Sequence, residues 1–265
     1  MRAITRVRTK AGLASLSCLA LLLIPGCATT DKEAEDLQNA RKAGSRMDIG
    51  VDHMDNGRTA LALREFMAAE SLDPANPRIQ YALGEAYMAR GLPDESEVHL
   101  LRALEIFPEF HDARLTLTAL YIVKGRYEDV IVNCQMLLDD PTFPLPWRAL
   151  GNKGWAEHKL GRNEEARRSL AMSREYRSGY WPAALSLAII ETEEGHRLEA
   201  IGLLQEIIDQ EPGPRVESEA NYRLAELYIS LGRRDRALGH LTASAAVEPD
   251  GEWARKSQEY LKLLQ

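Results

Sequence analysis

The sequence predicts an all-α protein, a right-handed α-solenoid of six helix-pair repeats that ends in a capping helix. Glycines recur along the chain at intervals of 34 to 37 residues. Small and bulky apolar residues recur between these glycines at fixed offsets, and a proline closes several of the repeats. A period of this length is typical of solenoids built from helix pairs. The repeating glycines are Gly57, Gly91, Gly125, Gly161, Gly195 and Gly232.

The first segment, residues 1–26, has the composition of a secretory signal peptide. Four basic residues come before an apolar stretch that runs from Ala11 to Pro25. A basic start, a short apolar stretch and small residues before a cleavage point define such signals. The alternative is a short N-terminal anchor helix, although the stretch is too short to span a bilayer comfortably.

Cys27 ends this leader, and its surroundings explain why the apolar stretch stops there. The run Ile24-Pro25-Gly26-Cys27 resembles a bacterial lipobox, with proline at the second position from the cleavage point as a departure. The resemblance implies cleavage before Cys27, lipidation of Cys27 and attachment to a membrane. Ala28 replaces the aspartate that retains such lipoproteins at the inner membrane, which implies an outer-membrane location with the body facing the periplasm. The polar residues 27–42 are predicted to be a lipidated tether that becomes helical late.

Residues 43–251 contain the six repeats, which resemble tetratricopeptide repeats. Unit two has Gly84, Tyr87, Ala103 and Pro108 at the characteristic offsets, and the other units match in part. Small residues let the two helices of a unit approach closely, and the proline ends the second helix because it lacks an N–H donor. The predicted units are 43–76, 77–110, 111–144, 147–180, 181–214 and 218–251.

Two joints between units are longer than the others and rich in proline. Asp139–Trp147 and Glu211–Glu219 are therefore predicted to be loops. Residues 252–265 contain Trp253, Tyr260 and two leucines at helical spacing. We expect this segment to be a helix that covers the apolar face of the last unit.

Composition and motifs argue against several classes of function. The net charge is −7, and removal of residues 1–26 would make it more negative, so the basic surface of a nucleic-acid-binding protein is not expected. We find no motif for a catalytic, metal or nucleotide site, and predict no enzyme, no cofactor and no small-molecule substrate. Cys134 falls at a packing position, so we expect a buried and inert thiol. The acidic run Glu191–Glu194 lacks the ligand spacing of a calcium loop, which favours a solvated helix end.

The resemblance to tetratricopeptide repeats implies a concave groove lined by the first helix of each unit. The groove would be largely apolar, and an uncovered apolar groove is typical of a site for a peptide or helix. The alternative is that these side chains pack between neighbouring first helices, and for Leu115 the two interpretations remain equally open. The predicted groove residues are Met47, Val51, Met54, Tyr81, Glu85, Met88, Leu115 and Ile122.

A lipoprotein made of six such repeats resembles the type IV pilus biogenesis lipoproteins, the secretin pilotins. The joint and helix pair "FPLPWRALGNKGWAEHKLGRNEEARRSL" is similar to a joint in that family. The resemblance implies that the protein binds secretin subunits and promotes their targeting to the outer membrane or their assembly there. Two alternatives remain: a periplasmic scaffold for other envelope complexes such as cell-wall enzymes, and an enzyme subunit or glycan-binding module, for which Trp147, Trp155 and Trp181 are the candidate aromatic surface.

Overall fold

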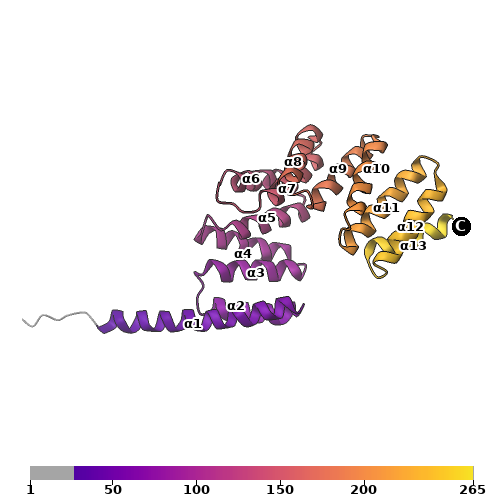
Figure 1. Ribbon diagram of the computed structural model, residues 1–265. Coiled ribbons are helices and arrows are strands. Elements are labelled where there is room, and N and C mark those ends of the chain that lie inside the picture. The colour runs from indigo at the N-terminus through magenta and orange to yellow at the C-terminus, as the bar shows by residue number, and fades with distance from the viewer. Residues whose placement is uncertain (1–26, 265) are drawn as a thin grey trace, which may run out of the picture.

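The computed structural model of the chain describes residues 27–264, and within them thirteen α-helices and no strand (Figure 1). The predicted signal peptide, residues 1–26, lies outside the described residues. The helices are α1 (Cys27–Asp55), α2 (Thr59–Glu70), α3 (Pro77–Ala89), α4 (Pro93–Ile106), α5 (His111–Val123), α6 (Tyr127–Leu138), α7 (Pro146–Lys159), α8 (Asn163–Tyr176), α9 (Trp181–Glu193), α10 (Arg197–Asp209), α11 (Pro214–Ser230), α12 (Arg234–Val247) and α13 (Glu252–Leu264).

Successive helices form six pairs, from α1 with α2 to α11 with α12, and α13 follows the last pair. The predicted solenoid of six units and a capping helix is therefore confirmed. Each pair turns at one of the six repeating glycines, whose φ angles lie between 69° and 85°. Only glycine adopts this conformation without strain. In the first turn the amide that follows Gly57 donates to the carbonyl of His53, at 2.8 Å, and so closes the end of α1.

Small residues bring the two helices of a unit into close contact. A Cβ added to Gly84 of α3 would lie 2.7 Å from Leu100 of α4, and one added to Gly154 would lie 2.6 Å from Leu170. A Cβ on Gly50 of α1 would overlap the ring of Phe66. The small positions of the repeat therefore serve as contact points at which a bulky residue of the second helix fills the space.

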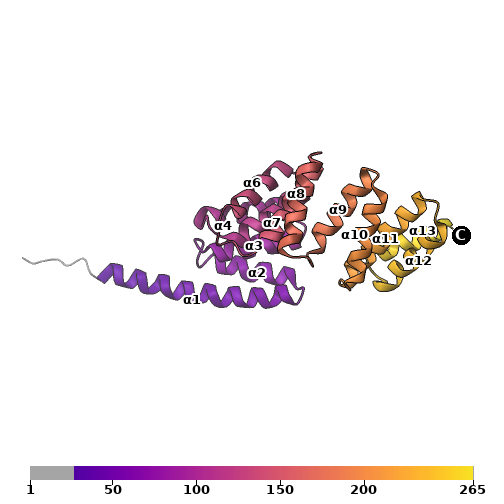
Figure 2. The ribbon, with the colours of Figure 1, turned by 45° about the horizontal axis from the view of Figure 1, so that its top comes forward.

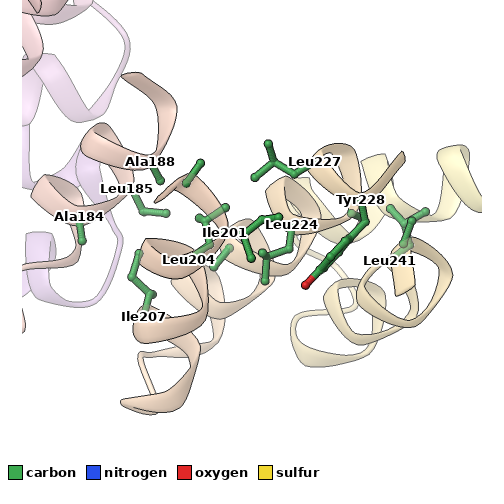
Figure 3. Close-up of a cluster of buried hydrophobic side chains, with 14 residues drawn as sticks. Ala184, Leu185, Ala188, Ile201, Leu204, Ile207, Leu224, Leu227, Tyr228 and Leu241 are labelled. Carbon is green, nitrogen blue, oxygen red and sulfur yellow. The ribbon is translucent and has the colours of Figure 1, made fainter. Parts of the chain in front are cut away.

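The buried apolar side chains form several clusters along the stack, which join helices of neighbouring units. Figure 3 shows one of them, in which side chains of α9 to α12 interlock. Leu204, Leu224 and Leu241 are fully buried in this cluster. Each such side chain contributes about 1.5–3 kcal/mol through burial. Since each unit contacts mainly its neighbours, these clusters are the principal source of stability.

The stack changes direction between α8 and α9. In Figures 1 and 2, α1 to α8 lie together on one side, and α9 to α13 extend away from them. The buried cluster at this junction is small and consists of Ala166, Leu170, Ala183, Leu187 and Ile190. The apolar contacts of this cluster nevertheless join α8 to α9.

The two longer joints between units differ from each other in structure. The α6–α7 joint is a loop that ends earlier than predicted, because α7 already begins at Pro146, and Asp140 accepts hydrogen bonds from Thr142 and His111 within this joint. These interactions, with that of the Thr142 hydroxyl the largest, lower the pKa of the Asp140 carboxyl to about 2. The expected loop Glu211–Glu219 is shorter than predicted, because α11 already begins at Pro214. Proline suits the first position of a helix, where its missing N–H is not needed.

Helix α1 corrects the expectation for the N-terminal tether. Residues 27–42 are helical from Cys27 onward and continue directly into the first unit. Most of the side chains between positions 32 and 42 are exposed, and Ala43 is the first fully buried residue. The first half of α1 therefore extends beyond the packed body (Figure 2). No helix within residues 27–264 has the length and apolar character needed to cross a bilayer.

Candidate functional site: an apolar hollow on the first helices

A hollow of about 560 Å³ lies on the inner side of the first three units. The first helices α1, α3 and α5 contact one another in sequence, and α2 contributes Phe66 to the lining. The residues that line the hollow are Met47, Val51, Met54, Asp55, Phe66, Arg78, Tyr81, Ala82, Glu85, Phe110 and Asp112. Its surface is mostly apolar, with charged groups among the lining residues.

Helical spacing explains how two helices supply most of the wall. Met47, Val51 and Met54 follow one another at intervals of four and three residues on α1. Residues at this spacing share one face of a helix. Tyr81 and Glu85 have the same relation on α3. The structure thus brings five of the predicted groove residues together around one space.

The other three predicted residues do not line the hollow. Leu115 is only 4% exposed and belongs to the buried cluster that joins α4 to α7, which favours the alternative that it packs between helices. Met88 and Ile122 are half-buried and pack against the same cluster. Helix α7 contacts α5 directly, and its Ala149 and Ala156 belong to the same buried cluster.

Phe110 and Asp112 are site residues that the sequence analysis did not find. Phe110 immediately precedes α5 and therefore lies outside the helical positions that the repeat pattern covers. Its ring lies 5.2 Å from that of Tyr81, tilted by 53°. Such tilted pairs are favourable for aromatic rings. An aromatic residue directly before a first helix is the signal that could have indicated it.

Acidic groups outnumber basic ones in the hollow. Asp55, Glu85 and Asp112 line it together with a single cation, Arg78. Burial raises the pKa of the half-buried Glu85 carboxyl; the Tyr81 hydroxyl offsets part of this increase, and the charge of Asp112 adds to it. Burial also raises the pKa of the Tyr81 hydroxyl. The mostly apolar lining of the hollow therefore carries an excess of negative charge.

A second cluster of charged residues has an arginine as its ion-pair partner. Glu191, Glu194 and His196 offer ligand atoms that lie within 4.8 Å of one another. Arg167 bonds to both carboxylates, with 2.8 Å from its Nε to an oxygen of Glu191, and lowers the pKa of each. The cluster is an ion-pair network that links α8 to the end of α9, and Arg167 compensates part of its negative charge.

The remaining polar and aromatic candidates have structural surroundings. Cys134 is fully buried, and burial raises the pKa of its thiol to about 12, which keeps the thiol protonated and inert. Trp147 lies 5.2 Å from the Arg177 guanidinium, and Trp155 lies 4.5 Å from the Lys159 ammonium. Trp181 packs against the buried cluster of α9 to α12. The three tryptophans therefore take part in separate local contacts.

Comparison with known proteins identifies the repeat. Three family profiles, each described as tetratricopeptide repeat, match residues 47–128, 147–172 and 191–258. No curated protein matches the chain.

Similar solved structures show the same fold at low sequence identity. PilW, described as a widely conserved type IV pilus biogenesis factor, is 20% identical with a TM-score of 0.71, and the match covers 82% of this chain and 98% of PilW. Pseudomonas aeruginosa PilF is 16% identical with a TM-score of 0.64, covering 84% of this chain and 99% of PilF. A tetratricopeptide repeat protein of Parabacteroides merdae is 19% identical with a TM-score of 0.64, and the match covers 84% of this chain and 91% of that protein. The chain is therefore a tetratricopeptide-repeat protein with six helix pairs and a capping helix.

Proposed function

We propose that this protein is an outer-membrane lipoprotein of the pilotin type, which binds type IV pilus secretin subunits and promotes their targeting or their assembly into multimers. The bound segment occupies the hollow of α1, α3 and α5. The observation that carries the proposal is this apolar hollow in the first units of a solenoid whose fold extends over 98% of PilW. Tetratricopeptide solenoids act as protein-interaction modules, in agreement with a binding role.

The hollow has the surface that an escort protein needs. A secretin segment that will later be buried in a multimer is apolar and prone to aggregate while it is exposed. Met47, Val51 and Met54 offer it a complementary apolar surface, and methionine adapts to irregular partners. Binding there would cover the segment until neighbouring subunits replace the escort, in the manner of helix-in-groove recognition.

The position of Cys27 supports a membrane-tethered form of this role. Cys27 begins α1, and Ala43, where the packed body starts, lies sixteen positions further along the helix. At 1.5 Å per residue, this stretch of helix is about 24 Å long. Lipid on Cys27 would hold the hollow close to the outer membrane without burying it, and several acyl chains make such attachment almost permanent.

A second candidate function is a scaffold for other envelope complexes, such as cell-wall enzymes. One observation favours it: the outer surfaces of two second helices carry exposed apolar side chains. Val132 and Met136 lie on α6, and Met172 and Tyr176 on α8, each between 47% and 61% exposed. A scaffold that holds two partners at once would use such a surface in addition to the hollow.

The experiment that separates the two functions compares cells with and without this gene. The type IV pilus secretin is resolved on an undenatured gel, and the total amount of its monomer is measured alongside. We expect the multimer to be lost while monomer persists. An unchanged multimer would contradict the pilotin function and favour the scaffold, whose partners would then be sought among envelope proteins by affinity capture.

A further inference from the structure

Of the three carboxylates that line the hollow, Glu85 is half-buried, whereas Asp55 and Asp112 are exposed. Glu97 of α4 pairs with both Lys124 and Arg126, and the buried Glu65 of α2 accepts a 2.7 Å bond from Arg46. Within residues 27–264, no lysine, arginine or histidine lies within ion-pair distance of Glu85, Asp55 or Asp112. The half-buried Glu85 thus lacks the cationic partner that Glu97 and Glu65 have.

The lack of an ion-pair partner destabilises the Glu85 carboxylate because this side chain is half-buried in the hollow. Tyr81 of its own helix and Asp112 of α5 act on its carboxyl, and Arg78 and Asp55 line the same hollow. A half-buried carboxylate beside another carboxylate is destabilised both by lost hydration and by repulsion. The raised pKa of Glu85 reflects these two effects. A cation that arrived with a ligand would remove the repulsion and form a charge-assisted hydrogen bond.

The corresponding position in unit six makes the contrast clear. Glu226 and Tyr222 on α11 have the same repeat positions as Glu85 and Tyr81 on α3. Glu226 shares one hollow with Glu193, Arg197 and Arg223, and another with Glu259 and Lys256. The glutamate at this repeat position therefore has three basic side chains among its neighbours in unit six, and Glu85 shares its hollow with one, Arg78.

We propose that the hollow of α1, α3 and α5 binds a protein segment in which a lysine or arginine lies beside apolar side chains. The cation approaches Glu85 and Asp112, and the apolar neighbours contact Met47, Val51 and Met54. The tilted rings of Tyr81 and Phe110 border the same space and favour a cation over their faces. This inference rests on the proposed function only in taking the hollow as the partner site, and it adds the chemistry of the partner.

The test uses a display library of random peptides, selected against the full-length chain. Parallel selections use the Glu85→Gln variant and the matched Glu226→Gln variant. We expect the peptides selected on the unaltered chain and on Glu226→Gln to be rich in lysine or arginine next to Leu, Ile, Met or Phe. The peptides selected on Glu85→Gln should lack this excess of basic residues.

A quantitative form of the test uses one selected peptide and its Lys→Gln version. The lysine should strengthen binding to the unaltered chain about tenfold, and binding to Glu85→Gln less than about twofold. Equal basic content in the wild-type and Glu85→Gln pools, or no basic excess at all, would overturn the inference. Selected peptides whose binding is unchanged by Val51→Glu bind elsewhere, and this result would overturn it as well.

The peptide-binding test and the secretin multimer experiment can give different answers, which distinguishes this inference from the proposed function. If the secretin multimer forms without this gene while the lysine dependence holds, the proposed partner is wrong and the chemistry of the hollow stands. If the multimer is lost but the lysine dependence is absent, the pilotin role stands and the inference about the cation is wrong.

Discussion

Glu85 is the residue at which stability and binding are expected to oppose each other. Its carboxyl has a raised pKa in the folded protein, so the folded state takes up a proton at a higher pH than the unfolded state does. The destabilising effect of the charge is fully present above the folded pKa. It decreases as the pH falls through that value towards the unfolded pKa, near 4.3.

The first prediction concerns Glu85→Gln. The substitution removes the charge, and we expect it to raise the midpoint of thermal unfolding by a few degrees at about pH 7, with the gain disappearing by about pH 4. Thermal melts of both proteins across this pH range provide the measurement, with Glu226→Gln as the control that should show a smaller change. A lower midpoint for Glu85→Gln at neutral pH would mean that the carboxylate stabilises the fold instead.

The second prediction concerns two glycines of the same helix. A Cβ at Gly50 of α1 would overlap the buried ring of Phe66, whereas a Cβ at Gly44 meets nothing within 4 Å. Gly50→Ala should therefore destabilise the first unit by about 1–3 kcal/mol through overpacking. Gly44→Ala should stabilise it by about 0.5–1 kcal/mol through helix propensity. Denaturant unfolding of the two variants tests this pair, and equal effects of the same sign would refute it.

Sequence reasoning located part of the candidate site at the level of single residues. The spacing of Met47, Val51 and Met54 identified one face of a helix, and the hollow lies on that face. Leu115 occupies an equivalent position but is buried, in a cluster that includes Ala149 and Ala156 of α7. Periodicity identifies which side of a helix faces inward, but neighbouring units determine whether that side remains open.

At the scale of elements, the helix pairs were predictable because the turn chemistry repeats. Each positive-φ glycine marks the end of a first helix, and all six were visible in the sequence. The starts of α1 and α11 were less predictable. Pro214 was interpreted as part of a loop, although it begins α11. Residues 27–42 are polar on all sides, so no apolar face indicated that they form a helix.

The third prediction concerns the capping helix. Helix α13 covers α11 and α12 with Trp253, Tyr260, Leu261 and Leu264, and its Ala254 is fully buried. Removal of residues 252–265 should destabilise the last unit by several kcal/mol, because these apolar contacts are lost. Hydrogen exchange should then increase in α11 and α12 and remain slow in α3 to α6, since each unit is stabilised mainly by its neighbours.

The control for this truncation is Leu263→Ser. Leu263 is 81% exposed, so the substitution removes apolar surface from the same helix without removing buried contacts. Its hydrogen exchange should match that of the unaltered chain. Faster exchange throughout the molecule after truncation would show that the solenoid unfolds as one cooperative unit, contrary to the expectation.

At the scale of the whole molecule, the two ends of the solenoid have different surroundings. The hollow lies on the first units, next to the helix that begins at Cys27, and α13 covers the last unit at the other end (Figure 1). A lipid on Cys27 would thus place the hollow nearest the membrane and extend the capped end away from it. This arrangement suits a protein that receives a membrane-bound partner through its first units.

The measurement that tests the central claim most directly is secretin multimer formation in cells that carry single Val→Glu variants. Val51 lies in the hollow and Val132 on the outer surface of α6, and they are 43% and 52% exposed, so neither substitution should prevent folding. Val51→Glu places a charge where an apolar segment must bind, and we expect at least about a tenfold loss of multimer. Val132→Glu should leave the multimer at its normal amount. Normal multimer with Val51→Glu, at equal protein level, would contradict the assignment of the hollow as the partner site.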